Sequence, residues 1–287
     1  FKRVFIIRKN IKEINPDVII AHCSREIVLT FLATLLMNKK IIGYIHSDPK
    51  KLIKEKSKLW LILTYFSFIF INHCIVFSRE AKKKLPLLAQ KKSIILQNVS
   101  SENINKKKNY KNKNIIMVGS LIDIKNHKFV INNFSKIVTK FPKWTLNIIG
   151  DGPLKSELKT LIKKKGLSKN IFLLGNKKNV FKYFDKASIF LLSSISEGMN
   201  LSMLEAAKYG LPIISSNCSL SHNDIIIHKK NGFLFDTRLE QEFLNYLLIL
   251  IKSEKKREKF GKASIKLSKK FKNKIILKKW EKLVSKN

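Results

Sequence analysis

Short apolar runs alternate with longer segments of helical periodicity along most of the chain. Runs of this length that are rich in β-branched residues fit strands that are buried on both faces. The runs fall at 17–22, 40–46, 74–78 and 93–98, and after a break at 114–119, 145–150, 171–175, 188–194 and 211–216. The alternation predicts an α/β protein in which helices cover both faces of parallel sheets.

The break between the two groups of runs is polar and low in complexity. Residues 100–113 show no apolar periodicity and are typical of a linker. We therefore expect two Rossmann-like, doubly wound domains facing a cleft, over 1–99 and 114–268, with a C-terminal helix at 269–287 that crosses back to the first. Ligands are expected at the carboxyl ends of the strands. Because the chain opens on an amphipathic pattern without methionine, we expect the first domain to lack upstream residues.

One apolar segment allows two interpretations. Residues 59–78 carry no charge and are long enough to span a bilayer of about 30 Å as a transmembrane helix. Asn72 and His73 interrupt the segment, so we favour a helix up to about Ile71, a turn, and a strand of a soluble sheet. A helix that is apolar on most of its faces can also enter a membrane interface.

The charge of the chain is strongly positive. It holds 58 Lys and Arg against 20 Asp and Glu, a formal net charge of +38. The excess is mostly lysine, spread from end to end, with much Ile, Asn and Phe, which favours genome composition as its cause. Only six arginines occur, and no basic strip with interleaved aromatics exists, so we expect no nucleic-acid partner. An anionic membrane surface fits the lysine excess.

The three cysteines indicate a reducing compartment. Cys23, Cys74 and Cys218 form no CxxC pair and no even-numbered framework. We expect a cytoplasmic protein, peripheral on the inner face of the cytoplasmic membrane, and no metal site.

Three strands of the second group end in glycine. Gly119, Gly150 and Gly175 can let the backbone approach a ligand closely, or can serve only the tight turns that any α/β protein needs.

Two isolated acids lie in the stretch "SEGMNLSMLE". From Ala187 to Ala207 the only charged residues are Glu197 and Glu205. Glu197 is expected in a loop, and Glu205 in the first turn of the helix that follows. Helix N-terminal N–H groups bind phosphates, and carboxylates accept hydrogen bonds from vicinal hydroxyls. The pair therefore suits a ligand that is part phosphate and part sugar. Alternatively, Ser202 and Glu205 form a capping box.

The sequence resembles the retaining group 1 glycosyltransferases, family four of the GT-B fold. The resemblance is strongest from about Asn114 to Phe235 and traceable from Asn15 to Asn98. It rests on "VGSLIDIKNHKFVINNF", "FPKWTLNIIGDGPLKSEL", "NGFLF" and the run from "GLSKNIFLLG" through "SEGMNLSMLE" to "GLPIISS", in family order and spacing.

The resemblance implies roles for the acids and their surroundings. Glu197 would face the donor sugar as a catalytic residue, and Glu205 would hold the ribose. The remaining donor-binding positions implied for this stretch and its neighbouring loops are Gly150, Asn179, Val180, Gly198, Met199, Asn200 and Leu201, with Asn179 and Val180 near the nucleobase.

The resemblance also implies residues for the diphosphate and the reaction centre. Lys125 matches the family lysine on the diphosphate, but Ser120 stands where the family usually has arginine, which leaves one phosphate-neutralising charge absent. His46, in "YIHSD", would line the reaction centre, although a structural histidine at a strand end is the alternative.

The resemblance implies a retaining, metal-independent glycosyltransferase without a cofactor. Its donor would be a nucleotide-diphosphate sugar, and its acceptor a hydroxyl on a lipid-linked, lipopolysaccharide or capsular glycan. Two alternatives stay open: another GT-B enzyme, such as a nucleotide-sugar epimerase, and a non-catalytic basic protein that binds membranes or nucleic acids.

Overall fold

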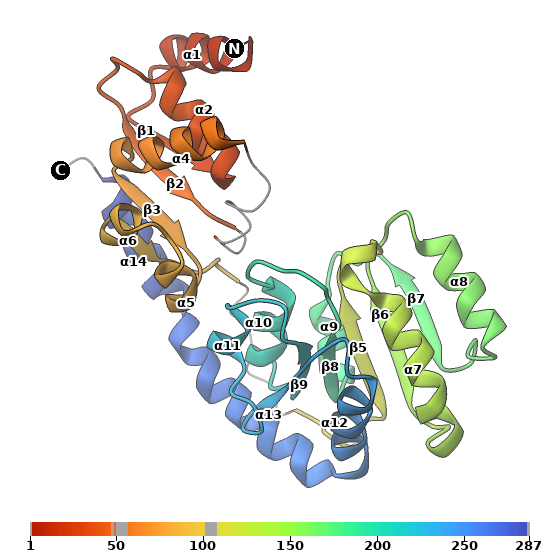
Figure 1. The fold of residues 1–287 in the computed structure, drawn as a ribbon. Helices are drawn as coiled ribbons and strands as arrows, with labels where there is room; N and C mark the ends of the chain where they lie inside the picture. Colours follow the sequence, from red (N-terminus) through yellow and green to blue (C-terminus); the bar gives the residue numbers. More distant parts are fainter. Residues whose placement is uncertain (1, 47–48, 50–56, 101–107, 286–287) are drawn as a thin grey trace. The chain divides into compact units, whose positions relative to one another are not determined.

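The computed structural model describes residues 2–46, 49, 57–100 and 108–285 (Figure 1). The chain forms two compact units. The first comprises Phe1–Val99 with Lys274–Asn287, and the second comprises Ser100–Asn273. Half of the predicted linker, residues 101–107, lies outside the described residues.

The first unit contains a parallel sheet in the order β1-β2-β3-β4, formed by Val18–His22, Lys40–Tyr44, His73–Val76 and Ser93–Ile95. Its described helices are α1 (Lys2–Ile14), α2 (Cys23–Ala33), α4 (Lys58–Phe70), α5 (Arg79–Lys83), α6 (Leu87–Lys91) and α14 (Asn273–Val284). All four strands predicted here are present. The last is shorter than predicted because, after Leu96 donates its N–H to Val76, the chain leaves the sheet.

The apolar segment 59–78 folds as a helix, a turn and a strand, as predicted. Ser57 caps α4 by accepting a hydrogen bond from the N–H of Trp60 at 3.4 Å. The helix ends at Phe70, Ile71 is extended, and β3 follows. Over the ranges that the structure describes, no helix is both long and apolar enough to cross a membrane.

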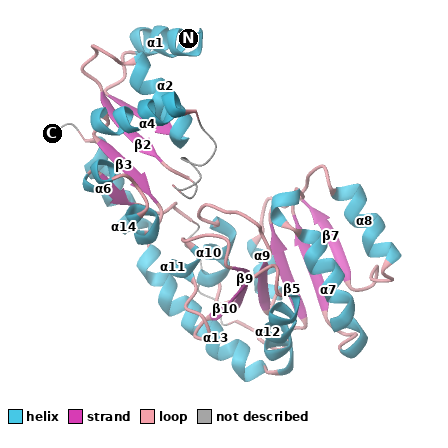
Figure 2. Cartoon of the chain, viewed as in Figure 1, coloured by secondary structure: helices cyan, strands magenta, loops and turns pink. Residues whose placement is uncertain are grey.

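The second unit contains a six-stranded parallel sheet in the order β10-β9-β8-β5-β6-β7. In chain order the strands are β5 (Asn114–Val118), β6 (Thr145–Ile149), β7 (Ile171–Gly175), β8 (Ile189–Leu192), β9 (Ile213–Ser216) and β10 (Gly232–Phe235). The helices are η1 (Asp123–Lys125), α7 (His127–Lys140), α8 (Lys155–Lys164), α9 (Phe181–Lys186), α10 (Leu201–Lys208), α11 (His222–Ile225), α12 (Glu240–Lys252), α13 (Glu254–Ser268) and η2 (Lys269–Phe271). Figure 2 shows these strands enclosed by helices.

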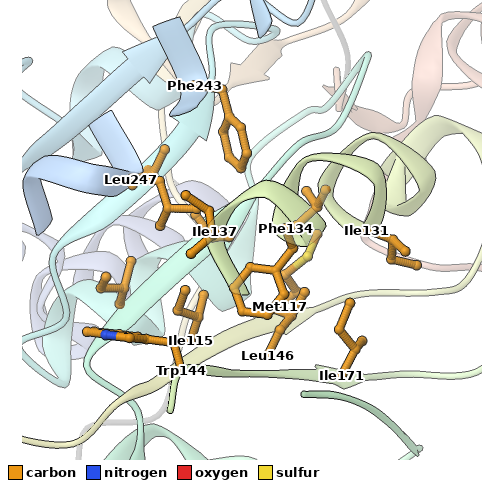
Figure 3. Packing of buried hydrophobic residues seen from close by; sticks show 14 of the residues in the cluster. Ile115, Met117, Ile131, Phe134, Ile137, Trp144, Leu146, Ile171, Phe243 and Leu247 are labelled. Atoms are coloured by element: carbon orange, nitrogen blue, oxygen red, sulfur yellow. The ribbon is translucent and has the colours of Figure 1, made fainter. Parts of the chain in front are cut away.

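Helix α7 shows how the second unit fills its core. Val130, Phe134 and Ile137 recur at helical spacing and are fully buried against the sheet. Figure 3 shows Phe134 and Ile137 close to Ile115 of β5 and to Leu146 of β6. Truncating such a phenylalanine to alanine typically costs about 3–5 kcal/mol of stability. Packing of this strength anchors β5 and β6, and the loops that follow these strands start from the anchored ends.

The segment just before β5 packs onto the second unit. The hydroxyl of Tyr110 donates to the carbonyl of Gly210 at 3.0 Å, and the guanidinium of Arg257 donates twice to the carbonyl of Tyr110, at 2.7 and 3.0 Å. A Cβ at Gly261 would lie 2.2 Å from the Tyr110 hydroxyl oxygen. Only glycine therefore fits at position 261 beside this tyrosine.

Candidate functional site

The candidate site lies at the carboxyl ends of β5 and β8, which are neighbours in the second sheet. Two loops leave these strands and bind one another. The N–H of Ile195 donates to the carbonyl of Ile124 at 2.8 Å. The hydroxyl of Ser193 lies within 3.0 Å of the carbonyls of both Lys125 and Asn126. Asn126 has φ +54°, a left-handed conformation that asparagine tolerates better than most residues.

An ion pair joins the two loops. Lys125 Nζ lies 2.5 Å from Glu197 Oε1, and the two side chains are only 17% and 11% exposed. The same carboxylate oxygen accepts from the hydroxyl of Ser194 at 2.6 Å and from the amide of Asn200 at 3.3 Å. The structure thus brings together three of the predicted site residues, Lys125, Glu197 and Asn200.

Asn200 also begins helix α10. Its side-chain oxygen accepts from the N–H of Met203 at 2.9 Å, which makes it the N-cap. The capping box on Ser202 is therefore wrong, because the helix already begins at Leu201. The side chain of Asn200 therefore links the N-terminus of α10 to the carboxylate of Glu197, and this fixes the position of the carboxylate relative to the helix start.

Glu205 lies in the second turn of α10, and not in the first turn as predicted. It is the fifth helical residue, because capping by Asn200 places the helix start earlier than the sequence indicated. Its side chain is half-buried. At a rise of 1.5 Å per residue, it lies about 6 Å along the helix axis from Leu201.

The loop that carries Glu197 is held from a second side as well. The carbonyl of Gly198 accepts hydrogen bonds from the hydroxyls of Ser219 at 2.8 Å and Ser221 at 2.6 Å. Met199 packs against the apolar cluster beneath α10, whereas Leu201 is 36% exposed. The loop conformation is therefore fixed by the protein itself.

Gly150 has a structural reason to be glycine. Its φ is +140°, and a Cβ there would lie 2.0 Å from the carbonyl oxygen of Gly119. No side chain fits, because the ends of β5 and β6 approach each other at this point. A Cβ at Gly119 would lie 3.4 Å from Lys125 Cε, so the lysine chain runs over this glycine.

Ser120, the position of the absent arginine, is exposed at the end of β5. Its carbonyl oxygen lies 3.2 Å from Nε2 of the buried His127. Burial, as the largest cause, lowers the pKa of His127. Asn179 and Val180 lie elsewhere, in the loop after β7, where Val180 is the N-cap of α9 and Asn179 is exposed.

His46 lies in the first unit, just after β2, and is half-buried. Its Nε2 is 2.6 Å from Nδ1 of His22, the last residue of β1. Burial lowers the pKa of His46, and the charge of His22 lowers it further. His22 was not among the predicted site residues, since a single histidine at a strand end carries no pattern.

The sequence also did not reveal His222, which is fully buried at the start of α11. Its Nδ1 lies 2.9 Å from the carbonyl of Ser216 and 3.1 Å from the hydroxyl of Ser215. Burial is the largest cause that lowers the pKa of His222. The ring supports the carboxyl end of β9 beside the loop of Glu197.

A polar pocket of about 550 Å³ adjoins this loop. Its lining includes Ile195, Ser216, Cys218, Asp236 and Arg238. Within the described part of the chain, no group of three His, Cys, Asp or Glu residues could hold a metal ion.

Comparison with known proteins identifies the class. The family model for glycosyl transferases group 1 matches residues 98–267, more than half of the chain, and includes both loops of the candidate site. The chain therefore belongs to the group 1 glycosyl transferases.

Individual proteins agree with this class. An uncharacterized glycosyltransferase of Methanocaldococcus jannaschii is 31% identical over 257 residues, which are 80% of this chain and 63% of that protein. An undecaprenol-linked glycan α-1,4-N-acetyl-D-galactosaminyltransferase of Campylobacter jejuni is 24% identical over 99% of this chain and 79% of its own length. This chain thus spans less than two thirds of the first of these relatives.

Solved structures show the same fold. The crystal structure of HepE from Anabaena, in complex with UDP-glucose, matches 97% of this chain and 82% of its own with a TM-score of 0.80 at 16% identity. The predicted fold class, α/β with two Rossmann-like parallel sheets of the GT-B type, is confirmed.

Proposed function

We propose that this chain transfers a sugar from a nucleotide-diphosphate sugar to a hydroxyl group of a glycan acceptor. The observation that carries the proposal is the largely buried ion pair of Lys125 and Glu197 at the carboxyl edge of the second sheet. It joins one cation and one carboxylate beside a helix N-terminus, which suits a ligand with a diphosphate at one end and a sugar at the other.

The pair would change partners when the donor binds. In the ligand-free chain the ammonium of Lys125 and the carboxylate of Glu197 neutralise each other at 2.5 Å. A diphosphate would take the ammonium, and the hydroxyls of the donor sugar would take the carboxylate. Ser194 and Asn200 already donate to Glu197, so the carboxylate stays in place during this exchange. Charge developing on the leaving diphosphate would then be met by a preorganised cation.

Two finer parts of the proposal rest on the family resemblance. The transfer retains the anomeric configuration, and it needs no metal because Lys125 and the start of α10 neutralise the leaving group. Ser120 supplies no charge in place of the family arginine. Donor binding by this chain therefore relies more heavily on Lys125.

The acceptor is proposed to be lipid-linked and held at the inner face of the cytoplasmic membrane. The Campylobacter relative is named for an undecaprenol-linked glycan. In this chain, the outer face of α4 leaves apolar side chains in solvent: Leu59 is 66% exposed, Ile62 52% and Phe66 49%. Helix α6, which packs beside α4, adds Leu87 at 76%. A helix with such a face, on a chain of net charge +38, fits an anionic lipid surface.

A donor panel tests the transferase proposal. The chain is incubated with UDP-, GDP- and ADP-sugars, with and without undecaprenyl-diphosphate-linked glycans, and products are followed by mass spectrometry and NMR. We expect one donor to give an acceptor-dependent product whose new linkage has the anomeric configuration of the donor. Epimerisation of the nucleotide sugar without acceptor would instead favour the epimerase, and binding of none of these nucleotides would contradict the proposal.

A further inference from the structure

Two histidines meet at the carboxyl edge of the first sheet. His22 ends β1, and His46 follows β2, the strand paired with it in register, so that His22 lies opposite Tyr44. Nδ1 of His22 lies 2.6 Å from Nε2 of His46, and the two rings are inclined by only 17° with centroids 4.9 Å apart. This contact is a direct hydrogen bond between two imidazoles.

Aromatic rings support His46 on its other sides. The ring of Tyr44 lies 4.2 Å from that of His46, and the ring of Phe77 lies 5.4 Å away. Tyr44 is in turn held by a hydrogen bond from its hydroxyl to Asn98 at 2.8 Å and by an edge contact with Trp280 of α14. These rings limit tilting of the imidazole, but an aromatic face does not select which ring nitrogen carries the proton.

The backbone beside His22 is strained. Cys23 has φ +68°, a left-handed value that costs a residue with a side chain about 1–2 kcal/mol. Strain of this kind persists only where the surrounding structure requires it, and it is common at functional sites. At this position it turns the chain sharply from β1 into α2 and leaves the ring of His22 at the edge of the sheet.

A hydrogen bond between two imidazoles restricts their protonation. One nitrogen must donate and the other must accept, so the ring that accepts is neutral at that atom. The bond therefore fixes the rotation of His46 and links its tautomer to that of His22, because Nε2 of His46 either donates to Nδ1 of His22 or accepts from it. A neighbouring group that fixes the tautomer of a functional histidine is a recurring device in enzymes.

We propose that His22 is a positioning residue that holds His46 in one tautomer and one orientation through the bond from Nδ1 to Nε2. The inference rests on the proposed function, in which His46 lines the reaction centre. In this account His22 touches neither the donor nor the acceptor. It acts only through His46.

Three variants of His22 separate the hydrogen bond from the space that the ring fills. The amide atoms of asparagine are bonded to Cγ, as Nδ1 is in histidine. An asparagine at position 22 can therefore still form a hydrogen bond with Nε2 of His46. His22→Leu fills the space without a polar atom, and His22→Gln carries its amide one carbon too far. His73→Asn is the matched control, because His73 begins β3 at the opposite edge of the same sheet. His46→Ala reports the loss of the ring itself.

Kinetics with the productive donor and acceptor give the first readout. We expect His22→Leu and His22→Gln to lower kcat about tenfold, the size expected for one hydrogen bond, with the KM for donor nearly unchanged. His22→Asn should recover most of the wild-type rate, and His73→Asn should equal wild type. If His22→Leu turns over like wild type while His46→Ala is impaired, the inference is wrong and the proposed function stands.

Imidazole ¹⁵N NMR of the ligand-free chain gives a second readout that needs no turnover. His46 should show a single tautomer in the wild type and in His73→Asn, and a mixture of tautomers in His22→Leu. An unchanged tautomer in His22→Leu would overturn the inference. If no nucleotide sugar is turned over, and His46→Ala binds the nucleotides of the donor panel as the wild type does, the proposed function itself fails. This outcome does not depend on the tautomer of His46.

Discussion

The two units hold their carboxyl edges in different ways. In the second unit, hydroxyls and an amide tie the loop of Glu197 to carbonyls and to the start of α10. In the first unit, one hydrogen bond joins His22 to His46, and the rest of the edge is held by ring contacts among His22, Tyr44, His46 and Phe77. Hydrogen bonds fix direction as well as position, whereas ring contacts tolerate sliding.

This difference indicates how the two edges would divide the work. A diphosphate and a sugar need donors and acceptors at fixed positions, which the second unit provides. A glycan on a lipid needs a broader and more adaptable surface, and the outer face of α4 gives the first unit an apolar side that the second unit does not need for the donor.

The largest effect is expected from Lys125→Met. The substitution keeps the side-chain length but removes the charge that would meet the leaving diphosphate. Loss of one such group from a preorganised site lowers kcat about 10²–10³-fold. Lys128→Met is the control, since Lys128 lies three residues further along the chain, in the first turn of α7, and pairs with Glu157 on the surface. Steady-state kinetics of both variants give the two kcat values. If Lys125→Met turns over as fast as Lys128→Met, Lys125 does not stabilise the leaving group.

Glu205→Gln should mainly weaken binding of the nucleotide. Loss of a charged hydrogen-bond partner costs about 1.5–3 kcal/mol, which is about tenfold to a hundredfold in the Kd of the nucleoside diphosphate. Glu240→Gln, which removes an exposed charge paired with Lys136, is the control. If Glu205→Gln lowers Tm but binds the nucleotide normally, Glu205 serves only the helix.

Leu59→Ser combined with Phe66→Ser should release the first unit from lipid. Each side chain loses up to about 1.5–3 kcal/mol of apolar burial, so partitioning onto vesicles of anionic phospholipid should fall about tenfold or more. Phe172→Ser, at an exposed phenylalanine of the second unit, should change nothing. Cosedimentation measures this. Equal binding of all variants to the vesicles would show that charge alone drives adsorption. If the wild type binds the vesicles as well at about 1 M salt as at low salt, electrostatic attraction does not contribute to adsorption.

The smallest effect concerns pH and stability. His222 is buried and its folded-state pKa is lowered, so the unfolded chain takes up a proton that the folded chain resists. The free energy of unfolding should therefore fall as pH drops below about 6.5, by at most about 1.4 kcal/mol per pH unit for this group. His222→Gln should flatten that slope, as seen in urea titrations at several pH values. His73→Gln is a comparison at a less buried histidine whose pKa is also lowered.

Much of the fold could be predicted from hydrophobic periodicity. The strands except β10 appeared as predicted apolar runs, and Asn72 with His73 marked the turn between α4 and β3. The run that forms β10, GFLF, contains no β-branched residue and was not predicted as a strand. The family resemblance assigned Lys125 and Glu197 to the same donor site, but it did not predict that they form an ion pair. Without the resemblance, the pattern of charges singles out only the two isolated acids, Glu197 and Glu205.

Other features depend on contacts that no local pattern encodes. The N-cap at Asn200 could not be chosen over Ser202, because both residues cap helices well. The choice depends on the conformation of the loop before α10, in which the side chain of Asn200 accepts from the N–H of Met203. Tyr110 lies in a stretch that is polar by composition, yet it is buried by partners about a hundred residues or more away. The bond between His22 and His46 likewise requires two parallel strands to be in register.

Calorimetric binding together with steady-state kinetics of Glu197→Gln tests most directly whether Glu197 and Lys125 serve different parts of the donor. If Glu197 serves the donor sugar while Lys125 serves the diphosphate, removing the carboxylate frees the ammonium. The nucleoside diphosphate should then bind as tightly as to wild type, or more tightly, while kcat falls by about a hundredfold. Weaker binding of the nucleoside diphosphate together with an unchanged kcat would contradict this division of roles.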